Sequence, residues 1–185
     1  MSFNNVTNNA EWVYEILNRE TLAKKDVKQR GFGAPYDKGH LAAARNHRWC
    51  REAHNDANLN SNIVPQNETL NSGPWRMAEN KCRELSSQNT TNNVHVYSGP
   101  IYRSLMNPPW FQEKLVPTHF FKVIIVENKD GTVRKPECYV FPNGNLDQEN
   151  LGDLTKHRKT IKQIEEVSGL TFIERRPNVR EINQQ

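Results

Sequence analysis

The strongest strand signal in the sequence lies at Thr118–Glu127, and it limits the chain to folds that contain a buried β-strand. This run holds two phenylalanines, two valines and two isoleucines, residue types that are enriched in strands. Apolar side chains at consecutive positions indicate a central strand covered on both faces. Asp130-Gly131 is typical of a hairpin turn, so we expect Thr132–Phe141 to return as the partner strand, with an edge or a bulge at Pro136.

The remaining periodic segments predict one more strand and three helices. Val94–Ser98 alternates, with its two valines on one face and His95 and Tyr97 on the other. The predicted helices cover the Trp12, Val13, Ile16 and Leu17 region behind Asn8 and Asn9 as caps, Pro74 to about Leu85, and Leu154–Ser168 with Gly169 as its end. We find no repeat and no linker. The sequence therefore predicts one α+β domain over residues 1–185, with a mixed, mainly antiparallel sheet and flanking helices.

Charge, cysteine content and hydropathy limit the partners and the location that we expect for the protein. The net charge is +4 and the pI about 9.0, which favours attraction to polyanions such as nucleic acid or acidic membranes. Cys50, Cys82 and Cys138 are odd in number and widely spaced, which indicates free thiols rather than a disulfide framework or a zinc site. No apolar run approaches the roughly 18 residues that a membrane span needs, so we expect no membrane insertion. No signal peptide or Arg-rich presequence opens the chain.

The stretch Tyr36–Arg48 places a candidate general base beside cations. His40 is that base, because imidazole titrates near neutral pH. Gly39 allows the backbone to approach a ligand closely, and Lys38 adds a positive charge that can contact a phosphate. The alternative is a histidine whose hydrogen bonds are satisfied within a loop. The residues alone leave both interpretations open.

A second polar stretch downstream supplies the other groups that phosphodiester hydrolysis needs. Asn71 offers a hard amide oxygen suited to Mg²⁺, or alternatively caps the helix that follows it. Glu79 lies just past the first turn of that helix, where it can reach a metal-bound water or instead pair with Arg83 at i+4. Asn62 lies in the extended segment before the helix and can steady the site by hydrogen bonds.

Other polar and aromatic residues have an ordinary structural interpretation beside a functional one. Three arginines can contact phosphates, although most arginines are surface residues without a ligand: Arg45, Arg48 and Arg83. Trp75 is interpreted as a core residue rather than a base-stacking platform. His54 and His119 have no partner at ligand spacing and are interpreted as structural. The basic run 156–159 is interpreted as a solvated face of a helix, with binding of a nucleic-acid backbone as the alternative.

These motifs resemble those of the DNA/RNA non-specific endonucleases, which belong to the ββα-metal (His-Me finger) class, and most closely their endonuclease G branch. The family pattern Asp-Arg-Gly-His is matched by Asp37-Lys38-Gly39-His40. The second pattern, Ser-Asn-x-x-Pro-Gln and then Leu-Asn-x-Gly-x-Trp-x-x-x-Glu, is matched by residues 61–66 and 70–79. The resemblance extends to residues 98–100 and 119–123 and covers most of the chain. Two long blocks in the right order are far more specific than either alone.

The resemblance implies a metal-dependent, sugar-non-specific endonuclease that hydrolyses DNA and RNA to 5′-phosphate and 3′-hydroxyl ends. His40 would be the general base, and Asn71 would bind one Mg²⁺, with Mn²⁺ also supporting activity. Glu79 would hold a metal-bound water, and Asn62 would support the site. The substrate would be contacted by Lys38, Arg45, Arg48 and Arg83. Members of this branch are usually homodimeric mitochondrial enzymes, which implies a homodimer and a mitochondrial location, with nuclear and secreted settings left open.

Two departures from the family pattern keep alternatives open. Lys38 stands where the family usually has arginine; lysine keeps the charge but loses the bidentate fork that positions a phosphate. Little sequence precedes the Trp12 region, so we expect a family strand and a targeting segment to be missing there. The alternatives are a nucleic-acid-binding homologue with weakened catalysis, and a nucleotide phosphodiesterase on the same scaffold.

Overall fold

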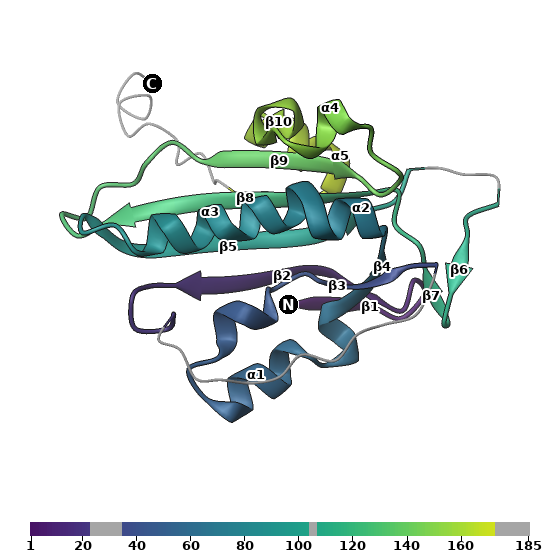
Figure 1. Cartoon of the computed structure of the whole chain (residues 1–185), viewed down its shortest axis with the longest axis horizontal. Coiled ribbons are helices and arrows are strands. Elements are labelled where there is room, and N and C mark those ends of the chain that lie inside the picture. Colours follow the sequence, from purple (N-terminus) through teal and green to yellow (C-terminus); the bar gives the residue numbers. More distant parts are fainter. Residues whose placement is uncertain (23–34, 104–106, 173–185) are drawn as a thin grey trace, which may run out of the picture.

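A six-stranded antiparallel sheet is the frame of the structure, a computed structural model that describes residues 1–22, 35–103 and 107–172. The strand order is β1-β2-β5-β8-β9-β10, and each neighbouring pair is antiparallel. Two small two-stranded antiparallel sheets, β3–β4 and β6–β7, lie outside this sheet (Figure 1). The predicted α+β class with a mainly antiparallel sheet is therefore confirmed.

The elements within the described residues have the following bounds. The strands are β1 Ser2–Asn4, β2 Asn9–Leu17, β3 Asp37–His40, β4 Ile63–Gln66, β5 Thr91–Ile101, β6 Trp110–Phe111, β7 Lys114–Leu115, β8 His119–Asn128, β9 Glu137–Pro142 and β10 Arg158–Lys159. The α-helices are α1 Arg51–Ala57, α2 Glu68–Leu70, α3 Arg76–Ser86, α4 Gln148–Leu151 and α5 Ile161–Ser168. Short 3₁₀ turns occupy Ala44–His47, Asn60–Asn62 and Leu154–His157, and a π-helical turn occupies Asn71–Trp75.

Strand β8 is the central strand that its apolar run predicts. Phe120 and Ile124 face one hydrophobic cluster, whereas Phe121 and Val123 face a second cluster on the other side of the sheet. The predicted hairpin turn is also present, since Gly131 has a φ of 81° and the return chain pairs with β8. The returning strand is shorter than predicted. Apart from one isolated bridge at Glu127 and Val133, its ladder begins after Pro136.

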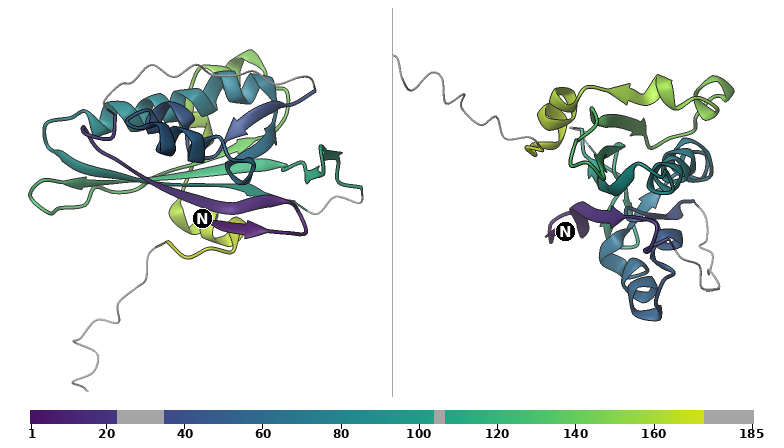
Figure 2. Two further views of the ribbon diagram at one scale, coloured as in Figure 1. Left: turned by 90° about the horizontal axis from the view of Figure 1, so that it is seen from below. Right: turned by 90° about the vertical axis from the view of Figure 1, so that its left-hand side faces the viewer.

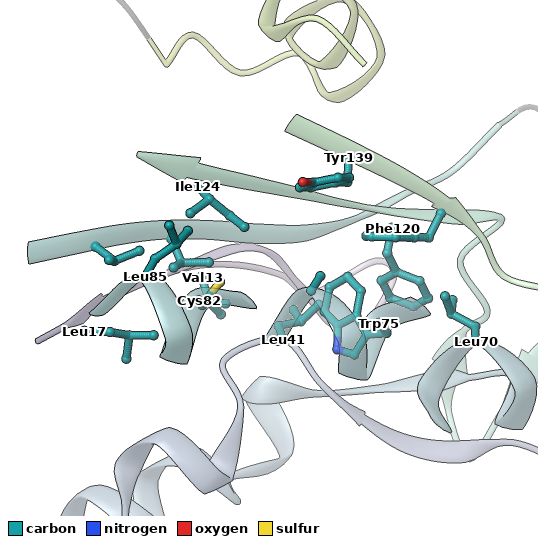
Figure 3. Close-up of a cluster of buried hydrophobic side chains, with 14 of the residues drawn as sticks. Val13, Leu17, Leu41, Leu70, Trp75, Cys82, Leu85, Phe120, Ile124 and Tyr139 are labelled. Atoms are coloured by element: carbon teal, nitrogen blue, oxygen red, sulfur yellow. The ribbon is translucent and has the colours of Figure 1, made fainter. Parts of the chain in front are cut away.

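Helices cover both faces of the sheet (Figure 2). Helix α3 lies across β5 and β8, and its buried residues Ala78, Cys82 and Leu85 pack against the sheet, as the predicted apolar stripe requires (Figures 1 and 3). Helix α5 covers the opposite face through Ile164, within the cluster that contains Phe121. The three cysteines are free thiols, as predicted.

The prediction of a helix around Trp12–Leu17 is wrong, because this segment is strand β2. Burial alternates along it: Val13, Glu15 and Leu17 point inward, whereas Ile16 is exposed. The middle inward position is occupied by Glu15, which is charged, so the apolar residues do not alternate with a period of two. Their spacing therefore resembles that of a helix. Asn8 and Asn9 lie at the turn and at the start of the strand, where they cap no helix.

The second predicted helix begins earlier than Pro74. Asn67 caps α2, since its side chain accepts a hydrogen bond from the Thr69 N–H. The chain then passes through the π-helical turn, kinks at Gly73 (φ −102°, ψ −116°) and continues as α3 with Pro74 inside the bent segment. The alternative interpretation of Asn71 as the helix cap is therefore wrong.

The predicted helix Leu154–Ser168 is also wrong in its first half. Residues 154–159 form a 3₁₀ turn and the edge strand β10, which pairs with β9. Helix α5 starts only at Ile161, behind a capping box of Thr160 and Gln163, and Gly169 ends it in the left-handed conformation as predicted. The basic residues of the run 156–159 are exposed, while His157 is buried. The polar sequence Arg175–Gln185 lies outside the described residues.

Gly99 yields a test of the sheet's packing. A Cβ at this position of β5 would lie 2.4 Å from the backbone oxygen of Glu11 and 2.6 Å from Cε1 of Phe121. Because a backbone oxygen cannot easily give way, we expect Gly99→Ala to destabilise the fold by about 1–3 kcal/mol. Urea denaturation measures this loss. Gly144→Ala is the control, since a Cβ there meets nothing within 4 Å; equal stability of both variants would contradict the packing assignment.

Candidate active site

A groove of about 360 Å³ gathers most of the residues that the sequence singles out. Its lining residues come from β3, the 3₁₀ turn that follows it, the π-helical turn Asn71–Trp75 and α3. Its lining carries one carboxylate and four cationic side chains. The lining residues are Lys38, His40, Ala43, Ala44, Arg45, Asn71, Ser72, Arg76, Glu79 and Arg83.

The two-stranded β3–β4 sheet holds the first motif in extended form. Asp37 lies opposite Gln66 in the antiparallel ladder and His40 lies opposite Ile63. A Cβ at Gly39 would lie 2.5 Å from Cβ and Oε1 of Gln66, which is itself buried. The glycine therefore makes room for a glutamine side chain, a different reason from the close ligand approach that the sequence suggests.

His40 is held at three points. Its ring Nδ1 lies 3.2 Å from the Lys38 carbonyl oxygen, and its Nε2 lies 3.1 Å from Oδ1 of Asn58. Its backbone carbonyl accepts a hydrogen bond of 3.2 Å from the indole Nε1 of Trp75. Burial lowers the pKa of His40 below its ordinary value, and the Asn58 and Lys38 hydrogen bonds oppose that effect. An imidazole with a lowered pKa is neutral at pH 7, as a general base must be.

Asn71 is positioned by a residue that sequence reasoning did not assign to the site. Its Nδ2 donates a hydrogen bond of 2.8 Å to Oδ2 of Asp37. This bond fixes the amide orientation and directs Oδ1 away from Asp37, as a hard donor oxygen. In the described part of the chain no group of three or more His, Cys, Asp or Glu side chains could enclose a metal. The Asn71 amide oxygen is a hard donor of the kind that suits Mg²⁺ or Ca²⁺.

Glu79 enters the groove from α3, above a buried cation. Burial raises the pKa of Glu79 to about 7, while the charges of Lys122 and Arg83 oppose the shift. Lys122 is 1% exposed; its Nζ donates to Oγ of Ser98 at 2.6 Å and lies 4.1 Å from the centre of the Trp75 ring. Trp75 is a core residue as predicted, and its indole N–H also serves the site.

Asn62 lies beneath the groove rather than in its lining. Its Oδ1 accepts a hydrogen bond of 2.9 Å from the Ala42 N–H. Its Nδ2 donates to the carbonyl oxygens of Ala42 and Ala57, at 2.8 and 2.7 Å. The side chain therefore fixes the segment that follows His40 to the end of α1, in keeping with a supporting position.

The structure brings two of the three singled-out arginines to the groove. Arg45 is exposed there, and Arg83 donates to Oδ1 of Asn46 at 2.8 Å. Arg48 is not among the lining residues, and its Nε is buried without a hydrogen-bond partner among the described residues. Sequence reasoning missed Arg76, which joins the lining because the π-helical turn brings the start of α3 to the groove.

The raised pKa of Glu79 predicts a pH-dependent stability. Between the ordinary pKa of 4.5 and about 7, the folded protein keeps a proton that the unfolded chain has released. Stability contributed by the neutral carboxyl is therefore full below pH 4.5, falls as the pH rises to about 7, and stays lost above it. Because part of the Glu79 surface is open to the groove, solvent reduces the effect. We expect the free energy of unfolding of metal-free Glu79→Gln to be about 1–2 kcal/mol higher than that of the parent at pH 8.

Urea denaturation at pH 4 and pH 8, in the presence of EDTA, measures this difference. At pH 4 the two proteins should have similar stability, because both side chains are neutral. Glu84→Gln on the same helix is the matched control, since Glu84 is exposed and its substitution should change stability by under about 0.5 kcal/mol. A parent and a Glu79→Gln variant with the same dependence on pH would contradict the assignment.

Comparison with known proteins gives the family. The model of the DNA/RNA non-specific endonuclease family matches residues 1–178. Endonuclease G, mitochondrial, from Bos taurus is 36% identical over 157 residues, which cover 80% of this chain and 50% of the relative. The mitochondrial nuclease of Saccharomyces cerevisiae is 27% identical over 215 residues, covering 95% of this chain and 63% of the relative.

A solved structure agrees with these matches. The crystal structure of the EndoG/EndoGI complex contains a chain that superposes with a TM-score of 0.80 and 27% identity, covering 93% of this chain and 81% of that chain. The chain spans about half the length of the mitochondrial endonuclease G sequences that it matches. The match of the family model over nearly the whole sequence shows that the chain belongs to the DNA/RNA non-specific endonucleases.

Proposed function

We propose that this protein is a metal-dependent endonuclease that hydrolyses phosphodiester bonds in DNA and RNA, leaving 5′-phosphate and 3′-hydroxyl ends. The observation that carries the proposal is the groove itself. It combines a histidine of lowered pKa, an amide oxygen directed by Asp37, and four cationic side chains. A module that only bound nucleic acid would need the cations but not the first two features.

Different side chains of the groove have different roles in hydrolysis. His40 takes a proton from the attacking water. Lys38, Arg45, Arg76 and Arg83 attract the polyanion and hold the phosphate by charge, without contacts that would select a base. Because contacts of this kind do not depend on the base, we expect the same groove to accept both DNA and RNA.

The residues that would hold a metal are Asn71 directly and Glu79 through a water. Mg²⁺, or Mn²⁺ in its place, supplies positive charge against the phosphate and the departing 3′ oxygen when bound. Asp37 keeps the Asn71 amide in the orientation that leaves Oδ1 available. Asn62 holds the chain after His40 in register with α1.

The relatives support a setting as well as an activity. Because the names of the matched curated relatives include mitochondrial endonuclease G and mitochondrial nucleases, we propose a mitochondrial location. We propose a homodimer only because the motifs resemble the endonuclease G branch, whose members are usually homodimers. The solved relative is named in complex with an inhibitor, which makes a protein inhibitor a reasonable partner class. Within the described residues, the helices are too short and too polar to cross a membrane.

His40→Ala tests the general base. With supercoiled plasmid and Mg²⁺, we expect the rate of nicking to fall by about 100-fold or more, because the proton acceptor is lost. Agarose gels measure the nicking, and circular dichroism and a DNA-binding assay show that fold and affinity persist. Undiminished nicking by His40→Ala would contradict the role of His40. Hydrolysis of dinucleotides by a parent that leaves plasmid intact would instead favour a nucleotide phosphodiesterase.

Asn71→Ala tests the metal site. We expect the Mg²⁺ concentration for half-maximal nicking to rise about 10-fold or more, since the one direct protein ligand is removed. Asn55→Ala is the matched control, because Asn55 is exposed on α1 and away from the groove lining. A metal titration unchanged in Asn71→Ala would remove the ligand assignment. If the parent binds DNA without cutting it and Lys38→Arg restores cutting, the weakened-homologue alternative holds.

A further inference from the structure

An exposed tryptophan lies just beyond the groove along the chain. Trp49 is 44% exposed and belongs to neither of the two hydrophobic clusters that fill the core. It follows Arg45, a residue of the groove lining, by four positions. Four residues of chain span at most about 14 Å, which is the length of about four stacked nucleotides in one strand. A strand whose phosphates lie in the groove is therefore long enough to reach Trp49.

The charge around Trp49 is entirely positive. Residues 41–51 contain three arginines, at positions 45, 48 and 51, and no aspartate or glutamate. Arg45 and Arg51 are exposed on either side of the tryptophan in the sequence. The first acidic residue after this segment is Glu52, within α1. An exposed aromatic ring among arginines is complementary to a nucleic-acid strand, which carries flat bases along a chain of negative phosphates.

The backbone that carries Trp49 is fixed on both sides. Before it, the side chain of Asn46 donates to the buried Glu15 at 3.3 Å and accepts a hydrogen bond of 2.8 Å from Arg83. After it, Cys50 caps α1, and its sulfur accepts a backbone hydrogen bond of 3.3 Å within the first turn. Because the backbone is already ordered, a base that stacks on the ring immobilises little additional chain.

A second exposed tryptophan in the described residues lacks the positive surroundings. Trp110 is 55% exposed on β6, where two prolines precede it and Glu113 follows three residues later. The nearest lysine in the sequence, Lys114, is buried and donates to the backbone oxygens of Asn8 and Asn60. Trp110 therefore matches Trp49 in exposure but not in charge, which makes it a natural comparison.

We propose that the indole of Trp49 is a stacking platform for an unpaired nucleobase, so that nucleic acid is bound as a single strand at this end of the groove. The inference rests on the proposed nuclease function and adds a base contact to its phosphate contacts. Stacking selects no sequence, because every base has a π-face. It does favour unpaired regions, because a base within a duplex must first be unstacked and unpaired.

Binding of labelled oligonucleotides to the metal-free protein tests the proposal without cleavage. Fluorescence anisotropy in EDTA compares oligo(dT) with an abasic strand of equal length, which keeps the phosphates and lacks the bases. We expect Trp49→Ala to bind oligo(dT) about 10-fold more weakly than the parent and the abasic strand equally well. Trp49→Phe, which keeps a smaller aromatic face, should retain most of the affinity. Oligo(rU) should give the same result, because stacking uses the base and not the sugar.

Two comparisons separate stacking from a general effect on binding. Trp110→Ala is the matched control and should bind both strands as the parent does. A duplex of the same length should bind Trp49→Ala within about 2-fold of the parent, because its bases are not available to the ring. Circular dichroism shows that the variants keep the parental fold.

Equal losses of affinity for oligo(dT) and the abasic strand in Trp49→Ala, or no loss for either, would overturn the proposal. A changed oligomeric state in analytical ultracentrifugation, with unchanged affinity for oligo(dT), would assign the ring to a contact with a second copy and would also overturn it. If the parent binds oligo(dT) through Trp49 but cuts no nucleic acid, the proposed function fails and the base contact stands. If the parent cuts plasmid and Trp49→Ala binds oligo(dT) equally well, only the base contact fails.

Discussion

The buried ammonium group of Lys122 is the interaction on which the site depends. It lies in β8, the central strand, directly beneath the ring of Trp75, and Ser98 on the neighbouring β5 accepts its hydrogen bond. Burying a cation is costly unless it has partners, and here an aromatic face and a hydroxyl are supplemented by the nearby Glu79 carboxylate. The same ring donates to the His40 backbone. Lys122 and the Trp75 ring above it therefore connect the sheet to the backbone of His40 and to the carboxyl group of Glu79.

Strong local patterns made much of the fold predictable. The β8 run, the hairpin turn after it and the α3 stripe each follow from residue type and spacing. Strand β2 was misread because Glu15 occupies an inward position, where its carboxylate accepts hydrogen bonds from Asn46 and His47. That partnership is tertiary and has no trace in the local pattern. The π-helical turn Asn71–Trp75, with its kink at Gly73, also has no periodic pattern in the sequence that predicts it.

The candidate site divides in the same way. His40, Asn71 and Glu79 stand out because their residue types suit hydrolysis and their motifs resemble a known family. Asp37, Arg76 and Asn58 were not assigned to the site, because only the folded chain shows that Asp37 contacts Asn71, that Arg76 lines the groove and that Asn58 contacts His40. Asn58 is an example. It is an exposed residue at the end of α1, and its side chain contacts the backbone carbonyl oxygen of His54 and the imidazole of His40.

The strand order has a consequence for how such a site can change. Strands β2 and β5 are direct neighbours, with Leu17 opposite Val94, yet the chain between them contains β3, α1, β4, α2 and α3. The residues that line the groove therefore all belong to the segment between β2 and β5, which leaves the sheet and returns to it at adjacent positions. Substitutions within that segment can change the residues that line the groove while the pairing of β2 with β5 stays the same. Outside that segment, β8 must keep Lys122, because the Trp75 ring packs against its ammonium group.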